Sequence, residues 1–506
     1  MLQLHKSFLS FVDTIQTRLQ HVRKQAMGDS LGQSISGMML PWVIDELESE
    51  QEFNRLVAET ESAFSGDHHR KGTKLWHRAV HNYFWRSGYY LGLASGEFIN
   101  LDDFFSKYCA SFTEPKVQMT YLAPLEFVHF AQPSMDFGTF QIKRFSVQEL
   151  ETVLQHHINS IFYPWAAISS DSLKLLSQYW FIQITEPADP SQIGVFTLPA
   201  SSSATLLFSG YAEREYTGFP LAVESALRQL CLFDWPSIGE GQRRTCNVMS
   251  RRDAEHAVWL KFNVPIVLKV NDDLIDFPER MPIIPELETE PLPDPKTQEE
   301  LGRVPLVKVY LDKAETQHFV MFMKHIGDMT HSLEKDSDNW SFVEIALGYF
   351  TKAFLTPPNP DQLLWHIVIM EALLGEGPDG ITERLARRIG LILGKDKNER
   401  KNISKRFRKL YDVRSSLIHG KSQSRADVTA IVDAYRFSRL AILWFLNYLS
   451  NIQSEIAKRK TGEKIPNRQE VLMLIDVDVD RRTHLRWLMD RVPSDFPYVA
   501  TWIERP

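Results

Sequence analysis

A chain of 506 residues is longer than a single hydrophobic core usually supports, so two or three domains are expected. Hydrophobic residues make up 43% of the chain and charged residues 24%, as in ordinary globular proteins, which argues against a disordered or fibrous protein. The net charge of -7 at pH 7 gives no sign of nucleic-acid binding through overall charge. Contact with a nucleic acid would need a local basic surface.

The cysteines and the apolar runs of the sequence predict the cellular compartment of the protein. Only three cysteines occur, Cys109, Cys231 and Cys246, and no two form a CxxC pair, so they are interpreted as reduced, apolar residues. The N-terminus lacks the pattern of a signal peptide, and the chain has no apolar run of the roughly eighteen residues that a membrane span needs. We therefore expect a soluble, cytoplasmic protein with no membrane partner.

Residues 1–118 are predicted to form a helical N-terminal region. Apolar residues such as Phe8 and Phe11 recur there at helical spacing. His77 and His81 share one face of a predicted helix, so a metal site is an alternative there, although neither a third ligand nor a catalytic glutamate accompanies them.

Residues 119–275 are predicted to form an α+β domain with a β-sheet. Short alternating runs such as YWFIQIT and VWLKFNVPIVLKV, bounded by Pro, Gly and Ser, indicate strands. Helices are interleaved with them, and one begins with a capping box of Ser146 and Glu149. In residues 276–304, prolines and acids alternate too often for a helix or a paired strand. This segment is therefore predicted to be a linker.

Residues 305–460 are predicted to form a helical domain, and residues 461–506 a C-terminal extension. A strand-like run at 304–310 comes first. Helical spacing, prolines and glycines then mark five helices, at 339–355, 361–375, 381–394, 398–419 and 425–450. The fold class is thus α+β, with a mixed α/β region in the N-terminal half and an all-α bundle, with its core at 339–450, in the C-terminal half.

Three residues of this bundle suggest a reaction. Glu371 lies in an apolar helix, where an unpaired carboxylate is costly to bury, and Arg414 is its expected partner. His419 follows Arg414 by five residues, a net rotation of roughly 140° on a helix, so the two share a face only if the helix ends near His419, which Gly420 favours. Arginine holds phosphate oxygens, and histidine transfers protons near neutral pH. This pair suits attack of a ribose 2′-hydroxyl on the adjacent phosphate.

A basic surface is predicted beside these residues. Residues 339–450 contain 17 Lys and Arg residues against 11 Asp and Glu residues, although the whole chain is acidic. The candidate RNA-binding residues are Lys401, Lys405, Arg406, Arg408, Lys409 and Lys421. A solvated helix face with no ligand is the alternative interpretation of this run.

These segments resemble a known family. EALLG at 371–375, GITERLARRIGLILG at 380–394 and LYDVRSSLIHG at 410–420 resemble the Apea-type branch of the HEPN superfamily over residues 339–450. The resemblance implies a helical bundle with a metal-independent endoribonuclease site, in which Arg414 and His419 form the RxxxxH motif and Glu371 orients them. Ser415 stands beside the motif arginine, where Asn, Asp or His is common, and it can still donate a hydrogen bond.

The same resemblance implies a homodimer in which two motifs face each other, no cofactor and no metal. It also implies a role in bacterial anti-phage defence or toxin-like growth arrest. Candidate substrates are tRNA and mRNA, and the trigger is open between a phage-derived and a small molecule, with residues 119–275 as sensor. The competing hypothesis is a non-catalytic RNA-binding or dimerisation module, in which Arg414 only satisfies Glu371 and His419 only caps a helix.

Overall fold

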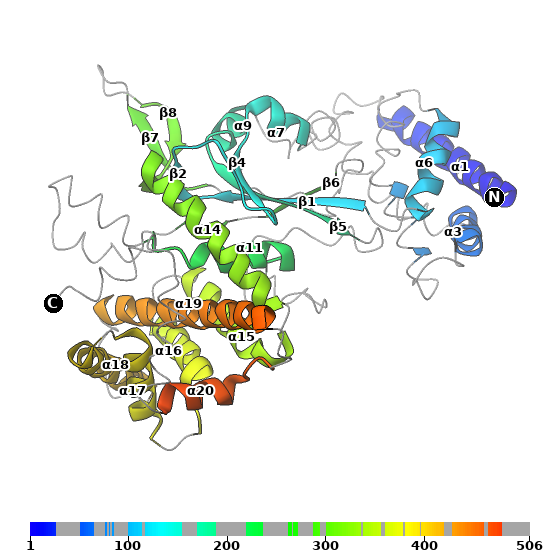
Figure 1. Cartoon of the computed structure of the whole chain (residues 1–506). Helices are drawn as coiled ribbons and strands as arrows, with labels where there is room; N and C mark the ends of the chain where they lie inside the picture. Colours follow the sequence, from blue (N-terminus) through cyan, green and yellow to red (C-terminus); the bar gives the residue numbers. More distant parts are fainter. Residues whose placement is uncertain are drawn as a thin grey trace. The chain divides into compact units, whose positions relative to one another are not determined.

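The structure is a computed structural model, and it divides the chain into two compact units (Figure 1). The first unit comprises residues 1–126, 140–205 and 264–306, and the second comprises residues 127–139, 206–263 and 307–506. Within them, the structure describes residues 1–26, 51–64, 76–77, 80, 83–84, 100–113, 117–153, 170–188, 219–235, 262–265, 267–271, 287–293, 300–334, 337–355, 360–377, 380–394, 396–418, 428–459 and 464–477.

The first unit begins with helices around an aromatic core. These are α1 (Leu2–Ala26), α3 (Gln51–Phe64) and α6 (Leu101–Thr113). Phe8 and Phe11 are fully buried on one face of α1, as their helical spacing predicted. The ring of His77 packs against the ring of Phe53, with their centroids 4.8 Å apart, and His81 lies outside the described residues. His77 therefore takes part in the aromatic packing of this core.

The sheet of the first unit is antiparallel. Its strands lie in the order β4 (Gln141–Arg144), β5 (Trp180–Ala188), β1 (Val117–Leu125) and β6 (Leu268–Asn271). The short helices α7 (Val147–Val153) and α9 (Ser170–Leu176) contribute to a buried cluster with Leu122 and Phe181 of the sheet. The predicted capping box at the start of α7 is confirmed, because Ser146 N donates to Glu149 Oε2 at 2.8 Å and Glu149 N donates to Ser146 Oγ at 3.2 Å.

The predicted absence of a paired strand from residues 276–304 is wrong. β7 (Thr289–Pro293) pairs antiparallel with β8 (Glu300–Pro305), with Pro291 opposite Arg303. Leu306 N donates to Glu288 O at 3.1 Å. In this register the ladder hydrogen bonds alternate, so the nitrogen of Pro291 faces away from β8. Proline is tolerated in this ribbon because each strand has one edge without a partner.

The second unit is mainly helical, and its long α19 is prominent in Figure 1. Its described elements are β2 (Phe127–Phe130), β3 (Ser134–Asp136), α11 (Leu221–Cys231), β9 (Val307–Leu311), α14 (Lys313–Glu334), α15 (Ser337–Leu355), α16 (Pro360–Leu374), α17 (Ile381–Leu393), α18 (Lys397–Ile418), α19 (Val428–Arg459) and α20 (Arg468–Asp476). β2 pairs parallel with β9. The α+β class is thus observed, with a small sheet in the N-terminal half and a helical C-terminal half.

The helices of the second unit pack on the apolar α16. Leu363, Ile367 and Leu373 of α16 are buried, and α16 contacts α15 and α19. α11, from the segment predicted to belong to the α+β domain, also packs in this unit against α14 and α15. α19 extends nine residues past its predicted end at 450. Within the described residues, no helix is both long and apolar enough to cross a membrane.

Candidate functional site

The candidate site lies within the second unit, where α18 packs against α16. Arg414 is on the last turns of α18, and its Nη2 lies 3.6 Å from Oε1 of Glu371 on α16. The predicted pairing of these two residues is confirmed. The side chain of Arg414 is 29% exposed and that of Glu371 is 24% exposed. The guanidinium is thus oriented by a carboxylate and is still accessible from solvent.

A third residue of the site, Tyr411, was not predicted. Its hydroxyl donates to Oε1 of Glu371 at 2.8 Å, and Cζ of Arg414 lies 5.2 Å from the centre of its ring. Burial, followed by the neighbouring Glu371 carboxylate, raises the pKa of Tyr411 to about 12. The hydroxyl therefore remains a donor at physiological pH. The signal in the sequence was its position one helical turn before Arg414.

Of the other two predicted catalytic residues, the structure describes Ser415 but not His419. Ser415 is half-buried and follows Arg414 on α18, about 100° further round the helix. His419 and Gly420 lie outside the described residues. α18 continues through Ile418, so the helix does not end between Arg414 and Ile418. Among the described residues, no group of three or more His, Cys, Asp or Glu side chains is arranged to hold a metal ion.

The end of α16 that carries Glu371 is fixed by two arginines. Arg468, the first residue of α20, donates from Nε to Ala372 O at 2.8 Å and from Nη2 to Gly375 O. Arg388 of α17 donates from Nη1 to Leu374 O at 2.6 Å, and only 2% of its side chain is exposed. Both satisfy carbonyls that a helix end leaves without partners, and both place a cation near the negative end of the helix dipole.

Two carboxylates surround the buried Arg388. Asp476, at the end of α20, lies 2.6 Å from its Nη2, and Glu376 lies 2.7 Å from the same nitrogen. Arg388 lowers the pKa of Glu376, first by hydrogen bonding and then by its charge. Neither Arg388 nor Arg468 was singled out from the sequence, because capping of one helix by residues of two others leaves no local pattern.

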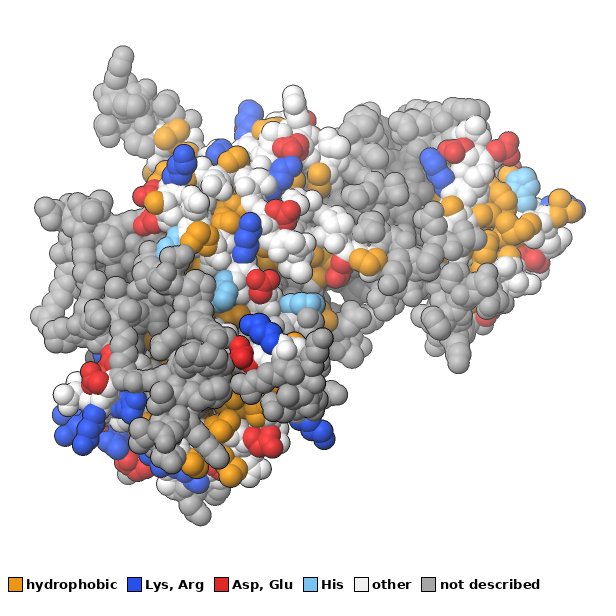
Figure 2. Space-filling view, in the orientation of Figure 1, with side chains coloured by type: hydrophobic (Ala, Val, Ile, Leu, Met, Phe, Trp, Pro, Cys, Tyr) orange, Lys and Arg blue, Asp and Glu red, His pale blue; other side chains and the backbone are white. Residues whose placement is uncertain are grey.

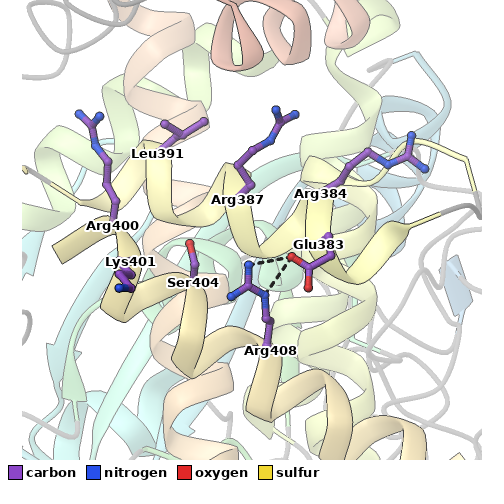
Figure 3. A pocket seen from close by; sticks show the side chains of 8 residues that line it. All are labelled: Glu383, Arg384, Arg387, Leu391, Arg400, Lys401, Ser404 and Arg408. Carbon is purple, nitrogen blue, oxygen red and sulfur yellow. Dashed lines mark hydrogen bonds and ion pairs between the residues drawn. The ribbon is translucent and has the colours of Figure 1, made fainter. Parts of the chain in front are cut away.

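A basic groove lies between α17 and α18, close to the candidate site along the chain (Figure 3). Its volume is about 540 Å³. The lining residues are Glu383, Arg384, Arg387 and Leu391 of α17 and Arg400, Lys401, Ser404 and Arg408 of α18. In Figure 2, Lys and Arg side chains gather over these helices at the lower left. The groove thus combines basic residues from both helices.

The predicted RNA-binding residues have different surroundings. Lys401 and Arg408 line the groove, whereas Lys405 and Lys409 are exposed on α18 outside it. The guanidinium of Arg406 binds Asp433 of α19, with Nη2 2.5 Å from Oδ1. Lys421 lies outside the described residues.

Comparison of the chain with protein-family models, with curated proteins and with solved structures gives no match.

Proposed function

We propose that this protein is a metal-independent endoribonuclease of the HEPN type. The observation that carries the proposal is the setting of Arg414: its guanidinium lies 3.6 Å from Glu371, its side chain is 29% exposed, and it stands five residues before His419. An oriented and accessible guanidinium is suited to holding a phosphate that enters from outside.

The proposed reaction begins with the ribose 2′-hydroxyl. A base removes its proton, the 2′ oxygen bonds to the adjacent phosphorus, and the bond from phosphorus to the 5′ oxygen breaks. The leaving oxygen then takes a proton, and the products carry a 2′,3′-cyclic phosphate and a 5′-hydroxyl. Arg414 stabilises the charge on the non-bridging oxygens, and His419 performs one of the two proton transfers. DNA lacks the attacking hydroxyl and is not cleaved in this way.

The remaining parts of the proposal concern assembly and setting. We infer a homodimer in which a second copy brings its own Arg414 and His419 to the same cleft and supplies the second proton transfer. Cleavage of tRNA or mRNA would then arrest growth of a phage-infected bacterium, with residues 119–275 acting as the sensor of a trigger. These parts rest on the resemblance of residues 339–450 to the HEPN superfamily.

The test compares RNA products made by three purified proteins in EDTA. Wild type is expected to produce ends with 2′,3′-cyclic phosphate from total RNA, and His419→Ala is expected to lose this activity by a factor of about 100 or more, the range of a lost general acid or base. His331→Ala is the matched control, because His331 is 65% exposed on α14 of the same unit. Equal cleavage by wild type and His419→Ala would overturn the catalytic role of His419. Cleavage only with added Mg²⁺ would overturn the metal-independent mechanism.

A non-catalytic RNA-binding or dimerisation module is the second candidate function. It is favoured by the pairing of Arg414 with Glu371, which satisfies a carboxylate whether or not RNA is cleaved, and by Ser415, which cannot share proton transfer. This alternative predicts that wild type binds RNA and releases no cyclic-phosphate ends under any condition, and that His419→Ala binds equally well.

A further inference from the structure

The groove between α17 and α18 forms because the two helices pack closely against each other. Gly390 of α17 lets the helices approach, because a Cβ there would lie 2.5 Å from Oγ of Ser404 and 2.8 Å from the carbonyl oxygen of Arg400. Oγ of Ser404 donates to Ala386 O at 2.6 Å and closes the floor of the groove. The basic side chains of the two helices are thereby arranged along one hollow (Figure 3).

The groove face of α18 leads toward the candidate site. Lys401, Ser404, Arg408 and Ser415 are spaced by three, four and seven residues, which keeps them within a stripe of about 60° on one side of the helix. Arg414 is about 100° from Ser415 and about 20 Å along the axis from Lys401. Ser415, at the end of this stripe, is next to Arg414 in the chain, so a chain of phosphates lying along the stripe reaches Arg414 by turning about 100° around α18.

The lining of the groove suits a phosphate backbone better than a nucleotide. Five of its eight lining residues are basic, one is acidic, and Leu391 is the single apolar one. None of the eight is aromatic, so the groove has no surface on which a base would stack. Basic side chains that are not accompanied by aromatic rings bind successive phosphates, and such binding does not depend on the base sequence.

Two arginines of the groove are paired with carboxylates of the same chain. Arg408 binds Glu383 at 2.7 Å, but the two side chains are 45% and 67% exposed. Arg387, 53% exposed, binds Asp476 at 2.8 Å, but Asp476 is 22% exposed and also binds the buried Arg388. The exposed pair of Arg408 and Glu383 contributes little stability, so a phosphate can replace Glu383. Among the described residues, no carboxylate lies within 4.0 Å of Lys401.

We infer that the groove between α17 and α18 binds the phosphate backbone of RNA and leads it toward Arg414, with Glu383 competing for Arg408. The inference rests on the proposed function for the identity of the polyanion as RNA. It extends the binding surface to α17, through Arg384 and Arg387, which the sequence did not indicate. Glu383 lowers the affinity of the empty groove and is displaced by RNA.

Binding is measured with the full chain and a fluorescent single-stranded RNA that is 2′-O-methylated throughout, so that it cannot be cleaved. The affinity is determined by anisotropy over a series of salt concentrations. Lys401→Gln and Arg408→Gln are each expected to lower the salt slope by about 0.7 and the affinity at physiological salt about fourfold. Glu383→Gln is expected to bind more tightly by a similar factor, because it releases Arg408 and removes a negative charge.

Lys324→Gln is the matched control, since it removes the same charge from an exposed position of α14 in the same unit, outside the groove. Circular dichroism confirms that each variant is folded. The inference is overturned if Lys324→Gln weakens binding as much as Lys401→Gln, or if Glu383→Gln binds more weakly than wild type.

The same proteins separate this inference from the proposed function. Wild type that binds through the groove but releases no cyclic-phosphate ends from unmodified RNA would overturn the nuclease and support the groove. Cleavage with an unchanged KM in Lys401→Gln and Arg408→Gln would overturn the groove and support the nuclease.

Discussion

The carboxylate of Glu371 is shared by two neighbours on α18, the hydroxyl of Tyr411 at 2.8 Å and the guanidinium of Arg414 at 3.6 Å. The shorter contact is the hydrogen bond, so Tyr411 fixes the carboxylate and the carboxylate orients the arginine. This order leaves Arg414 the more loosely held of the two. A loosely held guanidinium can turn to an incoming phosphate while Glu371 remains satisfied by Tyr411.

Replacing Tyr411 with Phe is expected to lower the free energy of unfolding at pH 7 by about 1 kcal/mol, the usual value of a hydrogen bond to a partly exposed group. The folded pKa of Tyr411 is about 12 and the ordinary value is 10.0. Between pH 10 and pH 12 the hydroxyl of Tyr411 ionises only in the unfolded chain, so the free energy of unfolding of wild type falls as pH rises above 10. The Phe variant has no such hydroxyl and does not show this decrease. The advantage of wild type is thus complete below pH 10 and disappears toward pH 12.

Urea denaturation of both proteins over this pH range measures the difference. Tyr310→Phe is the control, because Tyr310 is 48% exposed on β9, and a change of less than about 0.5 kcal/mol is expected there. A constant difference between wild type and Tyr411→Phe from pH 8 to pH 11 would contradict the assigned hydrogen bond.

At the scale of elements, α17 and α18 pack closely against each other at two glycines. A Cβ at Gly390 would lie 2.8 Å from the carbonyl oxygen of Arg400, and a Cβ at Gly394 would lie 2.8 Å from its backbone nitrogen. Nε of Arg400 donates to Gly394 O at 3.2 Å and caps the end of α17. The short separation between the helices therefore depends on residues without side chains, and the groove between them depends on the same residues.

Gly390→Ala is expected to destabilise the protein by about 2 kcal/mol, although alanine is the better helix former, because the methyl group would overlap a backbone carbonyl. Gly327→Ala is the matched control on α14: the nearest atom to its Cβ would be 3.8 Å away, so the change is expected to be neutral or to stabilise by up to about 1 kcal/mol. Thermal and urea unfolding measure both. Equal effects of the two substitutions would show that α17 and α18 do not approach closely at Gly390.

At the scale of the whole molecule, the second unit is assembled from segments far apart in the chain. Phe233, which follows α11, packs on Phe319 of α14 with ring centroids 5.0 Å apart. The buried Arg439 of α19 donates to Leu232 O and lies 3.7 Å from Asp234. Nε1 of Trp340 donates to Pro466 O at 3.1 Å, beside α20. The helices that carry the candidate site therefore complete their core with residues from before 305 and after 460.

The fragment 305–460, which the sequence pattern marks as the helical domain, is expected to fold poorly by itself. Without α11 and α20 it exposes Phe319 and leaves the buried Arg439 without its partners. We expect it to bind a hydrophobic dye and to unfold without a cooperative transition. The longer fragment 127–506, which contains every segment of the second unit, is the control. Cooperative unfolding of 305–460 without dye binding would contradict this expectation.

The sequence by itself determined the α+β class, the five helices α15 to α19 and the pairing of Glu371 with Arg414. These follow from the periodicity of apolar residues and from the cost of burying a lone carboxylate, both of which are local properties. Even the capping box at Ser146 depends only on residues three positions apart.

Only the tertiary structure decided the rest. The bond from Tyr411 to Glu371, the capping of α16 by Arg388 and Arg468, and the groove between α17 and α18 all join residues of different elements. The pairing of β7 with β8 was missed because proline content does not reveal which edge of a strand is hydrogen-bonded. Periodicity tells which face of an element is buried, and packing decides which face of another element it meets.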